Sequence, residues 1–231
     1  MIDLHTHSFL SDGALIPSEL VRRARVKGYR AIAITDHVDA SNVEFLVPQL
    51  VHVCQRLNEH SGLVVVPGVE VTHVPPRDLA AVVASARSAG AQLVVVHGET
   101  TVEPVAPGTN RAALELEIDV LAHPGLIRRE EAKLAARRGI ALELSARRGH
   151  SLSNGHVARI ALETGARLVL NTDAHEPGDL LTLQEARQVV LGAGLGARDV
   201  ERIYADAARL VERVSGRRPG RQKADRARKK A

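Results

Sequence analysis

The sequence predicts an α/β fold in which parallel strands alternate with helices, and three observations support this prediction. Apolar residues make up 45% of the 231 residues, whereas aromatic residues make up only 2%. The core must therefore be aliphatic, as it is where parallel strands are buried on both faces. Short apolar runs alternate along the chain with longer segments of helical periodicity. Histidines and carboxylates recur where the apolar runs end.

The apolar runs and the segments between them define the expected elements in chain order. We predict strands over residues 2–6, 30–35, 63–67, 92–97, 119–123, 140–144 and 167–172. We predict helices over residues 18–27, 42–60, 77–89, 110–116, 129–138, 154–164, 179–192 and 197–214. Gly28 should stop the first helix, and Gly90, Gly139 and Gly165 should end later helices in a left-handed conformation. Pro48 should kink the second helix or end its first turn.

Seven strand–helix units fit either a doubly wound sheet or a barrel, and the residues at the strand ends favour the barrel. Nine residues of metal-binding types lie at or just beyond the ends of six strands: His5, His7, Asp12, His37, Glu70, His97, His123, Asp173 and His175. In a parallel barrel all strand ends of one polarity lie on one face, where active sites are built. A lone residue of this kind would more often be structural, and Asp12 by itself also fits an ordinary turn.

The spacing and type of these nine residues point to metal binding. His5 and His7 are two residues apart on a strand, so their side chains point to the same side, and Asp173 and His175 share this spacing. Imidazole and carboxylate ligands without thiolates suit Zn, Mn or Fe. Because one ion needs three or four protein ligands, nine candidates predict two or three divalent ions, with Glu70 as a bridging carboxylate.

The order of these motifs resembles that of the PHP family, the polymerase and histidinol phosphatase domain. The resemblance covers about residues 1–195 and rests on His5 and His7, Ser11-Asp12-Gly13, Thr35-Asp36-His37, Gly68-Val69-Glu70, His97, Ala122-His123-Pro124 and Thr172-Asp173-Ala174-His175. It implies a distorted (β/α)7 barrel that holds up to three Zn, Mn or Fe ions at the C-terminal ends of its strands and hydrolyses phosphoesters. It also implies three ligand sets: His5, His7, Glu70 and Asp173; Glu70, His97 and His123; and Asp12, His37 and His175.

The reaction expected from these parts is hydrolysis of a small phosphate monoester, such as histidinol phosphate or a nucleotide. Two neighbouring cations would lower the pKa of a bridging water toward 7 and so provide hydroxide. The third ion, or a water on it, would serve the leaving group. The catalytic candidates are therefore Glu70, Asp12 and His175. Related amidohydrolases share the opening pair of histidines but usually bring a lysine from a middle strand, and no predicted strand here ends in lysine.

Three arginines are candidates for binding the substrate phosphate, because a guanidinium can hold it through two hydrogen bonds. Arg147 and Arg148 follow the sixth predicted strand, which is the one strand without a metal ligand. Arg111 ends the long connection over residues 99–111, which could cover the pocket. All three could equally be solvated loop charges. Asp36 could orient a ligand histidine, His73 could support the site, and His150 and His156 are assigned no role.

The distribution of charge sets apart the last sixteen residues. The formal net charge is +4, but eight of the 31 basic residues and one of the 27 acidic residues lie in residues 216–231. Residues 1–215, predicted as the barrel domain with its C-terminal helix, therefore carry 23 basic and 26 acidic residues, a net charge of −3. We predict that residues 216–231 form a disordered basic tail. Nucleic acid would bind only through this tail, and the alternative function is a 3′–5′ exonuclease or another nuclease.

Other features narrow the class of protein. The single cysteine, Cys54, excludes an internal disulfide and a cysteine-based metal site. No apolar run approaches the roughly 18 residues of a membrane span, and the N-terminus lacks the pattern of a signal peptide. We therefore expect a cytoplasmic protein with a small phosphorylated substrate and no membrane partner. A regulatory module that holds metal without catalysis is a third possible function.

Overall fold

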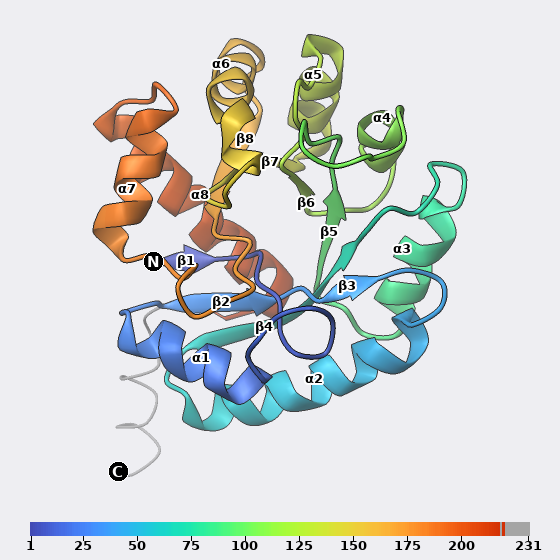
Figure 1. Ribbon diagram of the computed structural model, residues 1–231, viewed down its shortest axis with the longest axis vertical. Helices are drawn as coiled ribbons and strands as arrows, with labels where there is room; N and C mark the ends of the chain where they lie inside the picture. The colour runs from blue at the N-terminus through green and yellow to red at the C-terminus, as the bar shows by residue number, and fades with distance from the viewer. Residues whose placement is uncertain (218, 220–231) are drawn as a thin grey trace.

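Seven parallel strands form a nearly closed barrel with helices around it, as the computed structural model shows in Figure 1. The structure describes residues 1–217 and 219, so the tail predicted over residues 216–231 lies almost entirely outside the described residues. The order of the parallel strands confirms the predicted α/β barrel. Within residues 1–217, no helix is both long and apolar enough to cross a membrane.

Each of the seven predicted strands is present. In the order in which they pair, they are β1 (Ile2–Asp3), β2 (Ala31–Ile34), β4 (Val64–Val71), β5 (Leu93–His97), β6 (Val120–Ala122), β7 (Ala141–Ser145) and β8 (Arg167–Asn171). A short additional strand, β3 (His37–Val38), pairs with β4 and places His37 opposite Glu70. Because of this pairing, β4 continues four residues past its predicted end, and Glu70 lies within the strand rather than after it.

The barrel closes between its first and last strands just beyond their carboxyl ends. A parallel bridge joins Thr6 to Ala174, and the backbone N–H of Asp173 donates to the carbonyl of His5 at 2.9 Å. Lower down, the buried Asp3 carboxylate accepts hydrogen bonds from the N–H and the hydroxyl of Thr172. Two segments separated by nearly the whole barrel in sequence thus meet where both carry predicted metal ligands.

The eight predicted helices are present, and most keep their predicted bounds within a few residues. They are α1 (Pro17–Val26), α2 (Val43–His60), α3 (Leu79–Ser88), α4 (Thr109–Ala113), α5 (Arg129–Arg138), α6 (Asn154–Thr164), α7 (Leu183–Gly192) and α8 (Ala197–Ser215). Gly139 and Gly165 end their helices at φ values of 70° and 74°, the left-handed caps that the sequence predicts. Helix α2 does not end near Pro48, because its buried apolar face continues to Cys54.

The aliphatic core is divided by the barrel wall. The larger cluster lies between the strands and the surrounding helices. The smaller cluster fills the barrel interior with strand residues such as Leu4, Val66 and Val95, against which α8 packs Leu210 and Val211. Helix α8 therefore closes the end of the barrel at which the strands begin, and the opposite end is free to form a site.

Candidate metal centre

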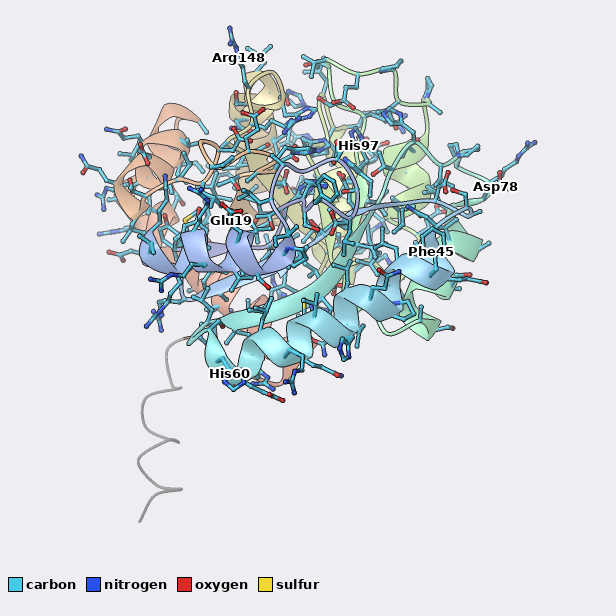
Figure 2. All side chains as sticks on the ribbon, turned by 60° about the horizontal axis from the view of Figure 1, so that its bottom comes forward. Glu19, Phe45, His60, Asp78, His97 and Arg148 are labelled. Carbon is cyan, nitrogen blue, oxygen red and sulfur yellow. The ribbon has the colours of Figure 1, made fainter. Side chains whose placement is uncertain are left out.

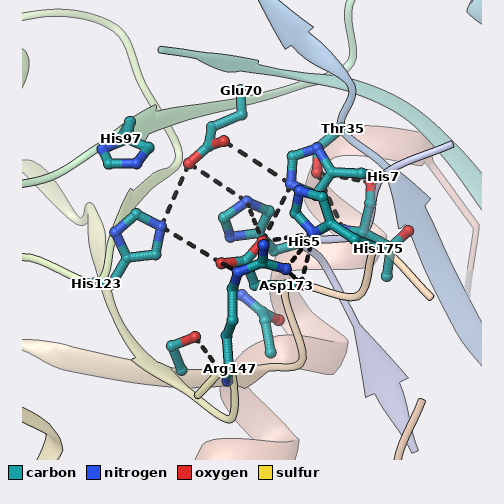
Figure 3. Close-up of polar contacts among 12 residues, drawn as sticks. His5, His7, Thr35, Glu70, His97, His123, Arg147, Asp173 and His175 are labelled. Carbon is teal, nitrogen blue, oxygen red and sulfur yellow. Dashed lines mark hydrogen bonds and ion pairs between the residues drawn. The ribbon is translucent and has the colours of Figure 1, made fainter. Parts of the chain in front are cut away.

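The nine predicted ligands all meet at the carboxyl ends of the strands. Seven of them line one cavity of about 490 Å³: Asp12, His37, Glu70, His97, His123, Asp173 and His175. His5 and His7 lie behind this lining, almost fully buried against Glu70 and Asp173 (Figure 3). The fold thus brings together residues that span 170 positions of sequence.

Glu70 and Asp173 lie between the imidazoles of the inner cluster. The Nε2 atom of His5 is 3.3 Å from Oε1 of Glu70, and Nε2 of His7 is 3.2 Å from Oδ1 of Asp173. Nε2 of His123 is 3.5 Å from Glu70 and 3.7 Å from Asp173. Each carboxylate therefore faces more than one imidazole, as a bridging ligand between two ions must.

Several buried atoms of this cluster have no hydrogen-bond partner in the described part of the chain. They are Nε2 of His5, Nδ1 and Nε2 of His7, Nδ1 of His123 and Oε1 of Glu70. Buried polar atoms in folded proteins are nearly always paired, so a group of unpaired ones calls for an explanation. Imidazole nitrogens and a carboxylate oxygen that converge without partners are a donor set that fits a divalent cation.

Glu143, which the sequence analysis did not single out, holds His5 in place. Its Oε2 atom lies 2.8 Å from Nδ1 of His5 and also accepts a hydrogen bond from the Asn171 side chain at 2.8 Å. This contact directs Nε2 of His5 toward Glu70, as outer carboxylates direct metal-binding histidines. The sixth predicted strand therefore supplies a supporting carboxylate. A glutamate inside the otherwise apolar run of residues 140–144 was the available signal.

The third predicted ligand set also comes together. Asp12 lies 3.5 Å from Nε2 of His37 through Oδ1 and 3.2 Å from Nε2 of His175 through Oδ2. His7 lies beside both histidines, with its ring centroid 4.2 Å from that of His37 and 4.1 Å from that of His175, and is the fourth member of this group. The Asp12 side chain is half exposed, so this group lies nearer the mouth of the cavity than the inner cluster.

Asp36 has a different role from the one that the sequence suggested. Its carboxylate makes no hydrogen bond to a ligand histidine in the described chain. It accepts hydrogen bonds from the N–H and the hydroxyl of Ser8 and from the hydroxyl of Ser11, each at 2.7 Å. Asp36 thus fixes the loop that carries His7 and Asp12, instead of orienting an imidazole.

A further group forms around His97 at the outer side of the cavity. Its members besides His97 are Glu103 from the β5–α4 connection, His73 and His150. Glu103 was not among the residues predicted from the sequence, and no metal-binding role was predicted for the two histidines. The unusual length of the connection over residues 99–111 was the only signal in the sequence.

The three candidate arginines lie in different surroundings. Arg147 lines the cavity and donates to the carbonyl of Asp173 at 3.1 Å, with Nη1 2.5 Å from Nδ1 of His175. Arg148 is exposed and points away from the barrel (Figure 2). Arg111 on α4 is paired with Glu115, which follows that helix, and does not line the cavity. The structure therefore brings only Arg147 of the three to the predicted ligands.

Burial and neighbouring charges shift the pKa values of the site residues in the metal-free protein. Burial lowers the pKa of His7 to about 3. Burial also acts on His37, but the Glu70 carboxylate and Asp12 outweigh it and raise its pKa to about 10. Burial alone would raise the pKa of Glu70, yet His5 and His37 hold it well below its usual range. Without metal, protonated imidazoles thus compensate buried carboxylates.

The chain is similar to several known proteins. The model of the PHP domain family matches residues 3–103. An uncharacterized protein of Methanocaldococcus jannaschii is 47% identical over 201 residues, which cover 86% of this chain and 92% of that protein. The DNA polymerase/3′-5′ exonuclease PolX of Bacillus subtilis is 30% identical over 204 residues, which cover 75% of this chain. The matched region spans only 34% of PolX.

Solved structures share the fold at low sequence identity. A chain from an archaeal ribonuclease P with mature tRNA gives a TM-score of 0.70 at 18% identity, with 90% of each chain covered. A histidinol phosphate phosphatase of Lactococcus lactis, crystallised with zinc, L-histidinol and phosphate, gives a TM-score of 0.57 at 17% identity. That match covers 84% of this chain and 94% of the phosphatase.

Proposed function

Because this chain belongs to the PHP domain family, we propose that it is a metal-dependent phosphoesterase that hydrolyses a small phosphate monoester. The observation that carries this proposal is the group of unpaired, buried imidazole and carboxylate atoms that converge on one cavity beside Arg147. Such a donor set fits cations, and a cation beside a guanidinium fits a phosphate group.

Three groups of residues would hold the metal ions. They are His5, His7, Glu70 and Asp173; Glu70, His97 and His123; and Asp12, His37 and His175. When bound, divalent ions lower the pKa of coordinated water and neutralise charge on phosphate oxygens. The residues themselves position these ions. Glu143 fixes the tautomer of His5, and Asp36 fixes the loop that carries Asp12.

Arg147 is the residue proposed to bind the substrate phosphate. Its Nη1 atom is engaged by Asp173 and His175, whereas its Nη2 atom makes no hydrogen bond within residues 1–217. The guanidinium is therefore anchored at Nη1, and at Nε by the Asp173 carboxylate 3.7 Å away, and Nη2 is left to donate to phosphate oxygens. Its side chain is only 34% exposed, so a contact to phosphate is partly shielded from water and salt.

The size and charge of the molecule favour a small substrate. A cavity of about 490 Å³ is in the range of small-molecule sites, and residues 1–215 have a net charge of −3. A long nucleic acid would need a basic surface beside the site to hold its backbone. Positive charge for a phosphate would instead come from Arg147 and the proposed ions at the site.

Metal analysis of the purified protein, followed by a screen of small phosphate monoesters beside single-stranded DNA and RNA, tests the proposal. We expect two or three divalent ions per chain and release of inorganic phosphate from a monoester. Arg147→Ala should raise KM about 10- to 100-fold, because a hydrogen bond to a charged group contributes about 1.5–3 kcal/mol. Arg148→Ala, the matched control, should leave KM unchanged. Metal-loaded protein that hydrolyses no monoester would contradict the proposal.

The second candidate function is hydrolysis of nucleic acid, which the similarity to PolX favours. PolX is named as a DNA polymerase and 3′-5′ exonuclease, although this chain matches only about a third of its length. A nuclease should bind single-stranded DNA with an affinity that falls steeply with salt. Deletion of residues 216–231 should then weaken that binding, whereas it should leave hydrolysis of a small monoester unaffected.

A further inference from the structure

We propose that Glu103, on the connection between β5 and α4, is a metal ligand at His97 that fastens this connection over the cavity. The inference rests on the metal-holding part of the proposed function, and it adds a loop residue to the nine ligands that the sequence predicts. It is carried by four observations: the contacts of Glu103, the orientation of the imidazoles around it, the backbone of His73 and the anchoring of the connection.

The Glu103 carboxylate faces three imidazoles. Its Oε2 atom lies 2.9 Å from Nε2 of His97 and 3.3 Å from Nε2 of His73, and its Oε1 atom lies 3.3 Å from Nε2 of His150. Four ligand atoms around one zinc ion, each about 2.0–2.2 Å from it, are about 3.3–3.6 Å apart. The separations of Glu103 from these imidazoles are close to this range, and the ligand atoms of His73, His97 and Glu103 all lie within 4.8 Å of one another.

The two buried imidazoles are held with one nitrogen directed at Glu103. Nδ1 of His97 lies 3.1 Å from the carbonyl of Gly98, to which it can only donate. Nδ1 of His150 lies 2.7 Å from the hydroxyl of Thr100. With Nδ1 engaged, the Nε2 lone pair of His97 is available to a cation. Both rings are only 4% exposed, so their orientation is fixed by the surrounding chain.

His73 has a strained backbone conformation, and its side chain lies beside Glu103. His73 has a φ of 53°, and the other non-glycine residues with positive φ in the described chain are His123 and Asp173, both in the predicted ligand sets. Such conformations cost free energy and persist where the structure requires a particular placement. At His73 the result is an imidazole 3.3 Å from Glu103 with its ring centroid 4.9 Å from that of His97.

The connection that carries Glu103 is anchored at both ends. The Glu99 carboxylate accepts hydrogen bonds from the N–H groups of Gly108 and Asn110 at 3.0 and 2.9 Å. At Gly98, a Cβ atom would lie 2.3 Å from the carbonyl of Ala122, so the chain there passes too close to β6 for a side chain. Both ends of the connection are thus fixed. A bond from Glu103 to a metal would also fix the part of the connection between Glu99 and Gly108.

A carboxylate ligand in this position should compete with the substrate phosphate. Both are anions that would take a coordination position at the ion near His97. Two anions bound side by side on one ion would repel each other. We therefore infer that a phosphate group must displace Glu103, and with it the connection, to bind that ion.

Zinc binding by matched charge-neutralising variants tests the proposal. Glu103→Gln should weaken the binding of one zinc ion at least about tenfold, measured by competition with a chromophoric chelator. The control is Glu130→Gln on α5, an exposed glutamate outside the cavity, which should titrate like the wild-type protein. Zinc should slow amide hydrogen exchange over residues 98–108 in the wild-type protein and the control but not in Glu103→Gln. With zinc saturating, inorganic phosphate should bind more tightly to Glu103→Gln than to the control.

Two outcomes would overturn the inference. One is an equal zinc titration of both variants, together with equal slowing of exchange over residues 98–108. The other is weaker phosphate binding by zinc-saturated Glu103→Gln than by the control. The exchange measurement on the wild-type protein needs no variant, so it decides the matter if Glu103→Gln does not fold. A wild-type protein that binds no zinc, manganese or iron would instead refute the proposed function.

Discussion

Two buried carboxylates at opposite ends of the barrel have different kinds of partner. Asp119, at the end closed by α8, accepts hydrogen bonds from Arg87 at 2.7 Å, Arg213 at 2.9 Å and the N–H of Val94 at 2.8 Å. Glu70, at the other end, faces histidines and the hydroxyl of Thr72, and its Oε1 atom has no hydrogen bond in the described chain.

The partners of Asp119 suit a carboxylate that stabilises the fold, whereas those of Glu70 suit a carboxylate that binds metal. An arginine is always charged and cannot bind a cation, so a carboxylate paired with arginines is fully compensated and chemically inert. A histidine can lose its proton and offer a lone pair, so a carboxylate among histidines can exchange protons for metal ions. We therefore propose as functional the end of the barrel where imidazole and carboxylate atoms are unpaired and where the non-glycine residues His73, His123 and Asp173 have positive φ.

Removing the Glu70 carboxylate should have the largest effect. We expect Glu70→Gln to reduce phosphoester hydrolysis by more than about a hundredfold, because even residues that only support metal ligands contribute 10- to 100-fold. The metal content per chain should fall as well. Initial rates and elemental analysis of the same preparation provide the measurement. Activity and metal content equal to wild type would remove Glu70 from the centre.

The matched change at the other end should affect stability instead. Asp119→Asn should lower the free energy of unfolding by roughly 1–3 kcal/mol, because it weakens hydrogen bonds to a charged acceptor. For a domain of this size, that corresponds to a decrease in Tm of several degrees. Metal content and activity at low temperature should match wild type. Loss of metal from a folded Asp119→Asn protein would break the distinction between the two ends.

The pH dependence of metal binding should be a graded effect. Against the effect of burial, Glu143 and Glu70 raise the pKa of His5 well above its usual value, and Glu70 raises that of His37 to about 10. At neutral pH both imidazoles are therefore protonated in the metal-free protein and must release protons to bind metal. Apparent affinity should rise as pH rises, by about tenfold per pH unit for each proton released.

Titration calorimetry with zinc at pH 6, 7 and 8, in buffers of different ionisation enthalpy, counts the protons released. Affinity that is independent of pH, with no proton release, would show that these imidazoles are already neutral. The same titrations on Asp119→Asn should give the wild-type slope, because that carboxylate lies at the other end of the barrel.

Residues next to strands could be placed from the sequence with good accuracy. His97 and His123 could be assigned to one face because parallel strands share a direction, so that the end of each apolar run marks the same rim. The predicted end of β4 was less accurate, because the extension of this strand to Val71 depends on its pairing with β3. Of the arginines, Arg147 and Arg148 are neighbours in sequence, and only the turn after β7 decides that the first faces the cavity.

By itself, the sequence determined the α/β class, the seven strands and the nine candidate ligands, because each depends on local periodicity and on residues next to it in the chain. The tertiary structure alone decided that Glu143 supports His5, that Asp36 holds the loop of Ser8 and Ser11, and that Glu103 reaches His97. These contacts depend on how distant segments cross in space. Local sequence patterns do not show which distant segments meet when the barrel closes.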